Sequence, residues 1–118
     1  MLKSVSSIFL FVSDIKQSRD WYEKALGFKP RYEDPDFALF EVGKTNLCFH
    51  RADSKSPLTT GGCVGYWWVD DFRGAVVHLS SLGGTIYRGP IPTEANLQIC
   101  QIKDPFGNVI GLEGEIQK

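Results

Sequence analysis

Cys48 and His50 are the residues of this chain whose types and spacing could do nucleophilic chemistry. They stand two positions apart in the segment "TNLCFH", so in a strand their side chains point to the same face. An imidazole beside a thiol can generate a reactive thiolate. Glu113, in the segment "NVIGLEG", could reach His50 as a base or hold a ligand. The alternative is a small buried cysteine, a histidine at the edge of a pocket and a glutamate in solvent at a strand end.

The other candidate residues indicate no further chemistry. Cys63 lies in a polar segment, Cys100 in a predicted strand and His78 between apolar residues of a predicted helix. The sequence contains no Gly-rich phosphate loop, no Cys-x-x-Cys pair and no Gly-x-Ser-x-Gly turn. Three cysteines form an odd set without disulfide-like spacing, which favours a reducing, cytoplasmic location.

The charge and hydropathy of the chain exclude two classes of partner. The 13 basic and 14 acidic residues give a net charge of −1, and no basic run occurs, so a nucleic-acid partner is not expected. The apolar run "IFLFV" is too short for a signal-peptide core or a membrane span, so no membrane partner is expected either.

An internal repeat predicts the elements that position these residues. Residues 7–28, "SIFLFVSDIKQSRDWYEKALGF", align without gaps with residues 64–85, "VGYWWVDDFRGAVVHLSSLGGT". Each copy reads as a strand, an acidic turn, an amphipathic helix and a glycine stop. We expect Asp14 to cap the first helix and Asp70 or Asp71 to cap the second, with Gly27 and Gly83 among the stop residues.

Each copy continues with three more predicted strands, so each half is a β-α-β-β-β module. In the first half these strands are residues 29–33, 37–42 and 45–50; in the second they are residues 85–89, 97–103 and 108–114, with a Pro-rich loop at 89–93. We predict a single domain over residues 1–118, built of repeats 1–52 and 62–118 and joined by a turn-rich linker at about 51–62.

Strand alternation assigns the side chains to two faces. The row of Ile8, Leu10 and Val12 is expected to pack on the first helix, and Trp67 is expected to pack on the second. The opposite faces then carry the aromatic residues, which a soluble domain rarely exposes without a purpose. The predicted ligand-binding residues on these faces are Phe9, Phe11, Cys48, His50, Tyr66, Trp68, Gly111 and Glu113.

Three segments resemble the vicinal oxygen chelate superfamily, which includes glyoxalase I, bleomycin-resistance proteins and extradiol dioxygenases. They are "FVSDIKQSRDWYEKALGF", "WVDDFRGAVVHLSSLGG" and "DPFGNVIGLEG". The resemblance implies an α+β fold in which two βαβββ modules form a half-open eight-stranded barrel, often completed in a homodimer. The metal enzymes of this superfamily use the cup of that barrel to chelate a substrate on a divalent ion.

The resemblance also implies where a metal would be held. The corresponding positions are Ser7, Cys48, Val64 and Gly111. Valine and glycine have no side-chain donor, a neutral serine is a poor ligand, and one cysteine cannot hold a catalytic ion alone. We therefore expect no metal and no cofactor, and we expect Gly111 to leave space in the cup.

The sequence favours a metal-free protein that binds an aromatic or amphipathic small molecule in a barrel cup, similar to the bleomycin-resistance branch. Open sheet edges lead us to expect a homodimer. One alternative is a lyase, an isomerase or a dioxygenase-like enzyme with a non-standard site around His50, Cys48 and Glu113. Another is a structural or regulatory dimer whose cup is filled by its own side chains.

Overall fold

The structure is a computed structural model that describes residues 1 and 3–117. The chain divides into two compact units, residues 1–58 and residues 59–118, and the boundary between them falls within the turn-rich segment at 51–62. Each unit contains one β-α-β-β-β module, as the repeat predicts, so the α+β class and the two modules are confirmed.

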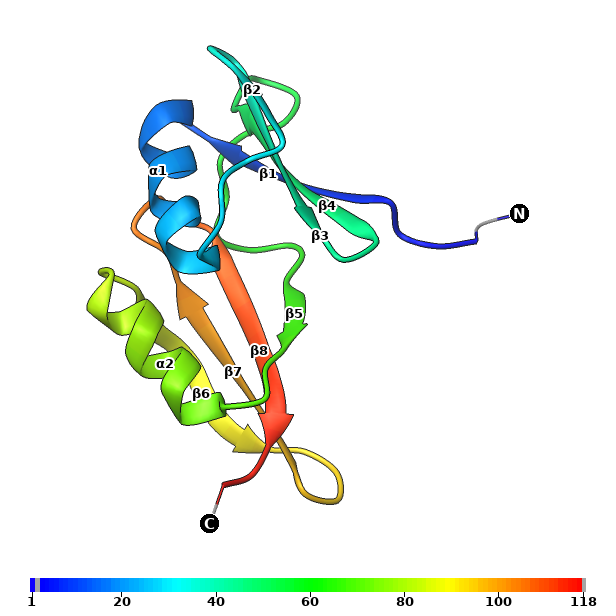
Figure 1. The fold of residues 1–118 in the computed structure, drawn as a ribbon, viewed down its shortest axis with the longest axis vertical. Coiled ribbons are helices and arrows are strands. Elements are labelled where there is room, and N and C mark those ends of the chain that lie inside the picture. Colours follow the sequence, from blue (N-terminus) through cyan, green and yellow to red (C-terminus); the bar gives the residue numbers. More distant parts are fainter. Residues whose placement is uncertain (2, 118) are drawn as a thin grey trace. The chain divides into compact units, whose positions relative to one another are not determined.

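The first unit is a four-stranded sheet with one helix (Figure 1). Its elements are β1 (Ser7–Val12), α1 (Ile15–Leu26), β2 (Tyr32–Asp34), β3 (Phe37–Val42) and β4 (Thr45–Arg51). The strand order is β1-β4-β3-β2, with β1 parallel to β4 and the other neighbours antiparallel. The helix lies against β3 and β4, so one face of this sheet is covered by α1 and the other is not.

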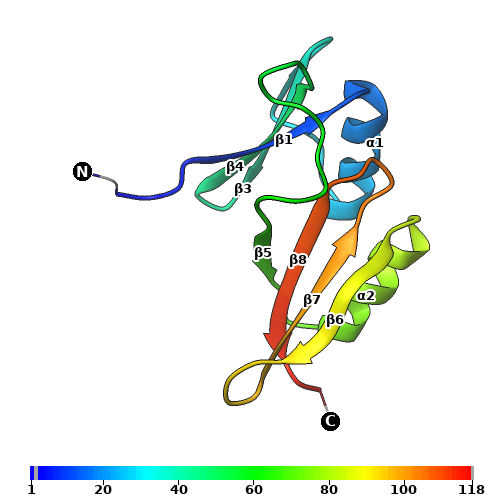
Figure 2. The ribbon, with the colours of Figure 1, turned by 180° about the vertical axis from the view of Figure 1, so that it is seen from behind.

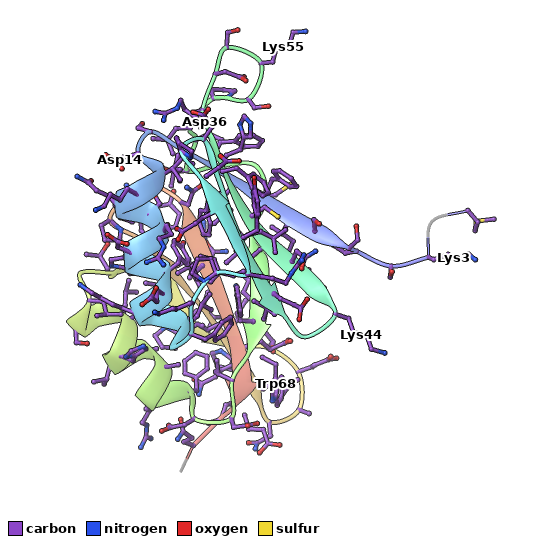
Figure 3. All side chains as sticks on the ribbon, turned by 45° about the horizontal axis from the view of Figure 1, so that its top comes forward. Lys3, Asp14, Asp36, Lys44, Lys55 and Trp68 are labelled. Carbon is purple, nitrogen blue, oxygen red and sulfur yellow. The ribbon has the colours of Figure 1, made fainter. Side chains whose placement is uncertain are left out.

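The capping residues of α1 are those that the sequence predicts. Asp14, marked at the beginning of the helix in Figure 3, accepts a hydrogen bond from the backbone N–H of Gln17 at 2.9 Å. At the other end Gly27 has a φ of 86°, which a glycine adopts without strain, and its N–H donates to the carbonyl of Glu23 at 2.8 Å. The helix therefore begins and ends where its local sequence satisfies the terminal backbone groups.

The core of the first unit lies between α1 and its sheet. Val12, Phe40 and Phe49 are fully buried, and the ring of Tyr22 lies 4.5 Å from that of Phe49. The predicted face is confirmed for Val12, whereas Ile8 of the same predicted row is 37% exposed. Trp21, which the predicted helix stripe omits, is also buried. Along the apolar row of β1, burial is most complete at Val12, the residue nearest to α1 in the chain. Burial of such apolar side chains is the main force that stabilises the unit.

The second unit repeats this arrangement (Figures 1 and 2). Its elements are β5 (Gly65–Trp68), α2 (Phe72–Ser81), β6 (Thr85–Pro92), β7 (Leu97–Lys103) and β8 (Val109–Glu115). The strand order is β5-β8-β7-β6, with β5 parallel to β8. Phe72 and Leu79 of α2 are buried with Ile102 and Leu112 of the sheet, so this unit has a core on the helix side as well.

The turn before β8 is built around Asp104, which is only 3% exposed. Its carboxylate accepts hydrogen bonds from the backbone N–H groups of Phe106, at 2.8 Å, and of Asn108, at 2.9 Å. The N–H of Asp104 in turn donates to the carbonyl of Asn108 at 2.8 Å. This side-chain acceptor and the positive φ of Gly107 form the tight reversal that the segment "DPFGN" predicts.

The predicted Pro-rich loop at residues 89–93 is wrong, because β6 continues to Pro92. The pairing of β6 with β7 shifts register between Ile86 and Arg88 and again between Arg88 and Ile91. β6 is an edge strand, so prolines that cannot donate to a neighbouring strand are tolerated there, and irregular pairing accommodates them.

Two further features bear on partners. Neither sheet closes on itself: the edges are β1 and β2 in the first unit and β5 and β6 in the second. A homodimer that covers such edges stays a prediction. Within residues 1 and 3–117, no helix is long and apolar enough to cross a membrane.

Candidate functional site

The uncovered face of the first sheet carries a group of rings. In the sheet register, Phe9 on β1 pairs with Cys48 on β4, and Phe11 pairs with His50. Phe37 on β3 pairs with His50 from the other side. We call the side chains of Tyr32, Phe37, Phe9, Phe11 and His50 the aromatic face.

The rings of the aromatic face form one continuous row. The centroid separations are 6.1 Å from Tyr32 to Phe37, 6.0 Å from Phe37 to Phe9, 6.4 Å from Phe9 to Phe11 and 6.3 Å from Phe11 to His50. Phe9 is 47% exposed and Tyr32 is 52% exposed, so part of the row is open to a ligand. Rings at these separations attract one another and can accept another flat ring beside them.

Cys48 lies on this face and yet is buried, with 1% of its surface exposed. Phe9 and Phe37 belong to the strands on either side of β4, which carries Cys48, and their ring centroids lie 6.0 Å apart. Burial is the main cause that raises the pKa of the Cys48 thiol, and a side-chain hydrogen bond with Ser7 only partly opposes it. Cys48 is therefore a covered thiol, which does not support the alternative of a thiolate nucleophile.

His50 is oriented by the backbone. Its Nδ1 lies 2.9 Å from the carbonyl oxygen of Arg51. A carbonyl can only accept, so in the neutral imidazole the proton is on Nδ1 and Nε2 is an acceptor. The ring meets that of Phe11 edge-on, at an interplanar angle of 66°.

In the second unit, β5 exposes aromatic side chains on the face opposite α2. Tyr66 is 43% exposed and Trp68 is 55% exposed, whereas Trp67 is half-buried on the helix side, so the predicted alternation of β5 is confirmed. Figure 3 marks Trp68 at the end of β5. Its indole N–H donates to Asp70 at 3.2 Å.

Gly111 does not leave open space, contrary to the prediction. A Cβ built on Gly111 would lie 2.6 Å from Cδ1 and 2.8 Å from Cγ of Tyr66, because the tyrosine ring covers the glycine. The hydroxyl of Tyr66 accepts a hydrogen bond from Nε2 of Gln101 at 2.9 Å, which holds the ring in place. The glycine in this strand thus provides room for an aromatic side chain of its own sheet.

Glu113 is half-buried next to Trp68 in the sheet register, with Ile99 on its other side. It belongs to the second unit and His50 to the first, so the predicted approach of these two side chains stays a prediction. The structure thus brings the predicted site residues together as two sets, one on each sheet.

A family model identifies the chain. The model described as the Glyoxalase/Bleomycin resistance protein/Dioxygenase superfamily matches residues 4–112. The chain belongs to this superfamily. A search of the curated proteins found no match.

Solved structures of the same fold are similar over nearly the whole chain. A glyoxalase/bleomycin resistance protein/dioxygenase family enzyme from Burkholderia phytofirmans is 19% identical with a TM-score of 0.81, covering 97% of this chain and 100% of its own. A glyoxalase-related enzyme from Fulvimarina pelagi is 18% identical with a TM-score of 0.79, covering 97% of this chain and 89% of its own. A virulence protein from Salmonella typhimurium is 22% identical with a TM-score of 0.73, covering 98% of this chain and 99% of its own.

The residues at the metal positions implied by the superfamily do not fit a metal ion. In the first unit Ser7 is hydrogen-bonded to Cys48, which is held as a thiol under the rings. In the second unit Val64 has an apolar side chain, and the ring of Tyr66 occupies the space where a side chain at Gly111 would begin. Among residues 1 and 3–117, no group of three or more His, Cys, Asp or Glu side chains could hold a metal.

Two members of the aromatic face, Tyr32 and Phe37, are absent from the predicted site. The signal for Phe37 is present in the sequence, because alternation along "FALFEV" places Ala38 and Phe40 toward the helix and Phe37 on the other face. Tyr32 could not be found in this way, since β2 is only three residues long and its pairing with Leu39 sets its face.

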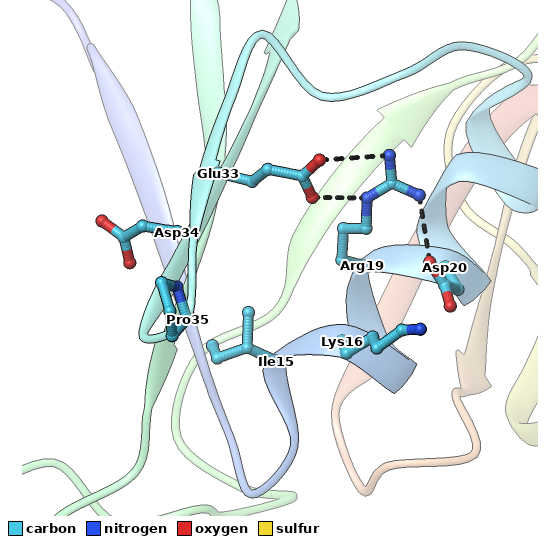
Figure 4. Close-up of a pocket in the computed structure, with 7 residues that line it drawn as sticks. All are labelled: Ile15, Lys16, Arg19, Asp20, Glu33, Asp34 and Pro35. Atoms are coloured by element: carbon cyan, nitrogen blue, oxygen red, sulfur yellow. Dashed lines mark hydrogen bonds and ion pairs between the residues drawn. The ribbon is translucent and has the colours of Figure 1, made fainter.

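A cavity of about 400 Å³ lies between α1 and β2 (Figure 4). It is lined by Ile15, Lys16, Arg19, Asp20, Glu33, Asp34 and Pro35. The guanidinium of Arg19 holds Glu33 at 2.6 Å, Asp20 at 3.0 Å and Glu23 at 2.8 Å. The pair with Glu33 joins the helix to the edge strand, whereas Asp20 and Glu23 belong to the helix itself, and the cavity contains none of the predicted site residues.

Proposed function

We propose that this protein binds a small, planar aromatic molecule on the aromatic face and needs no metal to do so. The observation that carries the proposal is the continuous row of rings from Tyr32 to His50 on the sheet face that α1 does not cover. Phe9 and Tyr32 are about half exposed in this row. Exposed apolar surface of this kind is unfavourable in water, and a bound ligand would cover it.

The chemistry of the face favours a flat ligand. A stacked or edge-to-face ring contact contributes about 0.5–1.5 kcal/mol beyond the burial of apolar area. A ligand the size of two fused rings could contact Phe9 and a neighbouring ring together, because their centroids are only 6.0–6.4 Å apart. A saturated molecule of the same size would gain from burial alone.

A metal-free mode of binding is supported by the donor set. The buried Cys48 thiol and the ring-covered Gly111 stand at positions where the metal enzymes of the superfamily would need ligands. The ligand must therefore be held by ring contacts and hydrogen bonds.

The proposal is tested by titrating the protein, dialysed against EDTA, with 2-naphthol and with its saturated analogue 2-decalol, followed by NMR chemical shifts. We expect 2-naphthol to bind more tightly and to shift resonances of β1, β3 and β4. Adding Zn²⁺, Ni²⁺ or Mn²⁺ should not change its affinity. Equal binding of the two compounds, or binding only after metal is restored, would contradict the proposal.

The matched variants are Phe9→Ala and Phe28→Ala. Phe28 is 41% exposed, close to the 47% of Phe9, but its ring contacts Phe40 on the helix side of the sheet, away from the aromatic face. Loss of one ring contact should weaken 2-naphthol binding about two- to tenfold in Phe9→Ala. Phe28→Ala should bind like the wild type, and a similar loss in both variants would point to a general effect on the fold.

A further inference from the structure

The polar groups around the aromatic face limit which aromatic ligand it can take. Most of the donors there are already committed to other groups of the same unit. The hydroxyl of Tyr32 donates to the carboxylate of Asp34 at 2.9 Å, and the guanidinium of Arg31 pairs with Glu41 at 3.3 Å. The Tyr32 hydroxyl would have to break this bond before it could donate to a ligand, and the charge of Arg31 is already balanced by Glu41.

Arg51, the residue after His50, also has partners at each of its three nitrogen atoms. Its Nε donates to Asp36 at 3.2 Å, its Nη1 to the carbonyl of Ser13 at 3.4 Å and its Nη2 to the carbonyl of Pro35 at 3.2 Å. A carboxylate on the ligand would therefore compete with Asp36 for Arg51 at this end of the row, and an ammonium would meet a carboxylate whose charge Arg51 already balances. The surroundings favour a ligand without a full charge.

The imidazole of His50 is different, because it offers an acceptor. The bond from Nδ1 to the carbonyl of Arg51 fixes the tautomer and leaves a lone pair on Nε2. Within residues 1 and 3–117, the structure records no hydrogen-bond partner for Nε2. In the sheet register His50 stands between Phe11 and Phe37, so this acceptor lies beside the rings on which a flat ligand would stack.

We propose that the ligand is a neutral phenol-type molecule, an aromatic ring whose hydroxyl donates a hydrogen bond to Nε2 of His50. The inference rests on the proposed function and deepens it by naming the chemical class. The ring of the ligand packs on the rings of the aromatic face. His50 favours molecules that carry a hydrogen-bond donor on the edge of that ring.

The inference is tested by comparing 2-naphthol with 2-methoxynaphthalene, which has the same rings and an oxygen that cannot donate. One hydrogen bond of ordinary strength corresponds to about three- to tenfold in affinity. We expect wild-type protein to prefer 2-naphthol by that factor at neutral pH. His50→Phe keeps a ring but removes the acceptor, so this variant should bind both compounds equally.

The possible outcomes separate the two proposals. Equal binding of the two compounds by wild-type protein, or a preference that persists in His50→Phe, would overturn the phenol inference alone. Binding of neither compound would overturn the proposed function and this inference with it. If His50→Phe does not fold, ¹⁵N NMR of the wild-type imidazole decides instead: Nδ1 should carry the proton, and the Nε2 resonance should shift with 2-naphthol and not with the ether. A proton on Nε2, or no shift, would overturn the inference.

Discussion

The ring of Tyr66 lies on Gly111, the paired residue of the neighbouring strand. A Cβ at position 111 would approach two carbons of that ring to 2.6 and 2.8 Å and the carbonyl oxygen of Gly65 to 2.9 Å. Because the pair sits in the middle of the register of β5 and β8, the glycine and the tyrosine constrain each other. A glycine weakens a strand, and an aromatic ring from the next strand covers the exposed backbone.

Gly111→Ala should therefore destabilise the protein by about 1–3 kcal/mol, the range for overpacking a well-packed site. The added methyl must move the Tyr66 ring and weaken its hydrogen bond with Gln101. Urea unfolding measures this loss. Gly61→Ala is the control, since a Cβ there meets no atom within 4 Å and should change the stability little.

A double-mutant cycle with Tyr66→Ala checks the cause. In Tyr66→Ala the added methyl of Gly111→Ala no longer meets the ring and is close only to the Gly65 carbonyl. The losses of stability in the two single variants should therefore exceed the loss in the double variant, by about 1 kcal/mol in sum. Additive effects would show that the ring does not restrict position 111.

The adjacent tryptophans of β5 should respond differently to truncation. Trp67 is half-buried on the helix side, so Trp67→Ala should cost about 2–3 kcal/mol, somewhat less than for a fully buried tryptophan. Trp68 is 55% exposed, so Trp68→Ala should cost about 0.5 kcal/mol or less. Thermal melts of the two variants compare them directly, and a larger loss in Trp68→Ala would mean that the register of β5 is inverted.

The sequence predicts most of this fold because its local signals agree with one another. Asp14 and Gly27 mark the ends of α1, and alternation in β1 separates Val12, which is buried, from Phe9, which is 47% exposed. The residues at the two ends of α1 satisfy its terminal backbone groups, and the buried face of β1 follows from the alternation of side chains along a strand. Both features can be predicted without knowing contacts to distant parts of the chain.

What the sequence does not predict depends on contacts between strands. The cover over Gly111 depends on the side-chain conformation of Tyr66, and the row of rings depends on Phe9 and Phe37 approaching each other from separate strands. The continuation of β6 to Pro92 depends on its place at the sheet edge, which the order of the strands determines. These are tertiary effects, and periodicity along one segment carries no information about them.

The thiols should report on the aromatic face. Cys63 is exposed, whereas Cys48 and Cys100 are buried, so a thiol-specific disulfide reagent should modify Cys63 alone in the native protein. Phe9→Ala removes one of the two rings that cover Cys48 and should make Cys48 the second reactive thiol. In the control Phe28→Ala, Cys48 should stay protected. In the double variant Phe9→Ala with Cys48→Ser, modification of the second thiol should be lost. Rapid modification of Cys48 in native wild-type protein would contradict the covering by Phe9 and Phe37.

The N-cap of α2 should make stability depend on acid. Asp71 accepts a hydrogen bond from the N–H of Gly74 at 3.0 Å and another from Nε2 of Gln117 at 2.9 Å. The bond from Gly74 is the main cause that lowers the pKa of Asp71, and the bond from Gln117 adds to it. A carboxyl whose pKa is lower in the folded than in the unfolded state binds fewer protons when folded. Its contribution to stability is present above the unfolded pKa, about 3.9, and is lost as the pH falls through the folded value.

Asp71→Asn should therefore flatten the fall of the melting temperature below about pH 4, because asparagine still caps the helix but does not titrate in this range. Gln117→Ala keeps the carboxylate and removes one of its donors, so its acid profile should lie between those of the wild type and Asp71→Asn. Thermal melts from pH 7 to pH 2.5 at constant ionic strength measure all three profiles. Parallel profiles for wild type and Asp71→Asn would show that the capping bond does not favour the charged carboxylate. The ordering of the two variants then tests the causes separately: an unchanged Gln117→Ala profile beside a flattened Asp71→Asn profile would assign the whole effect to the Gly74 N–H.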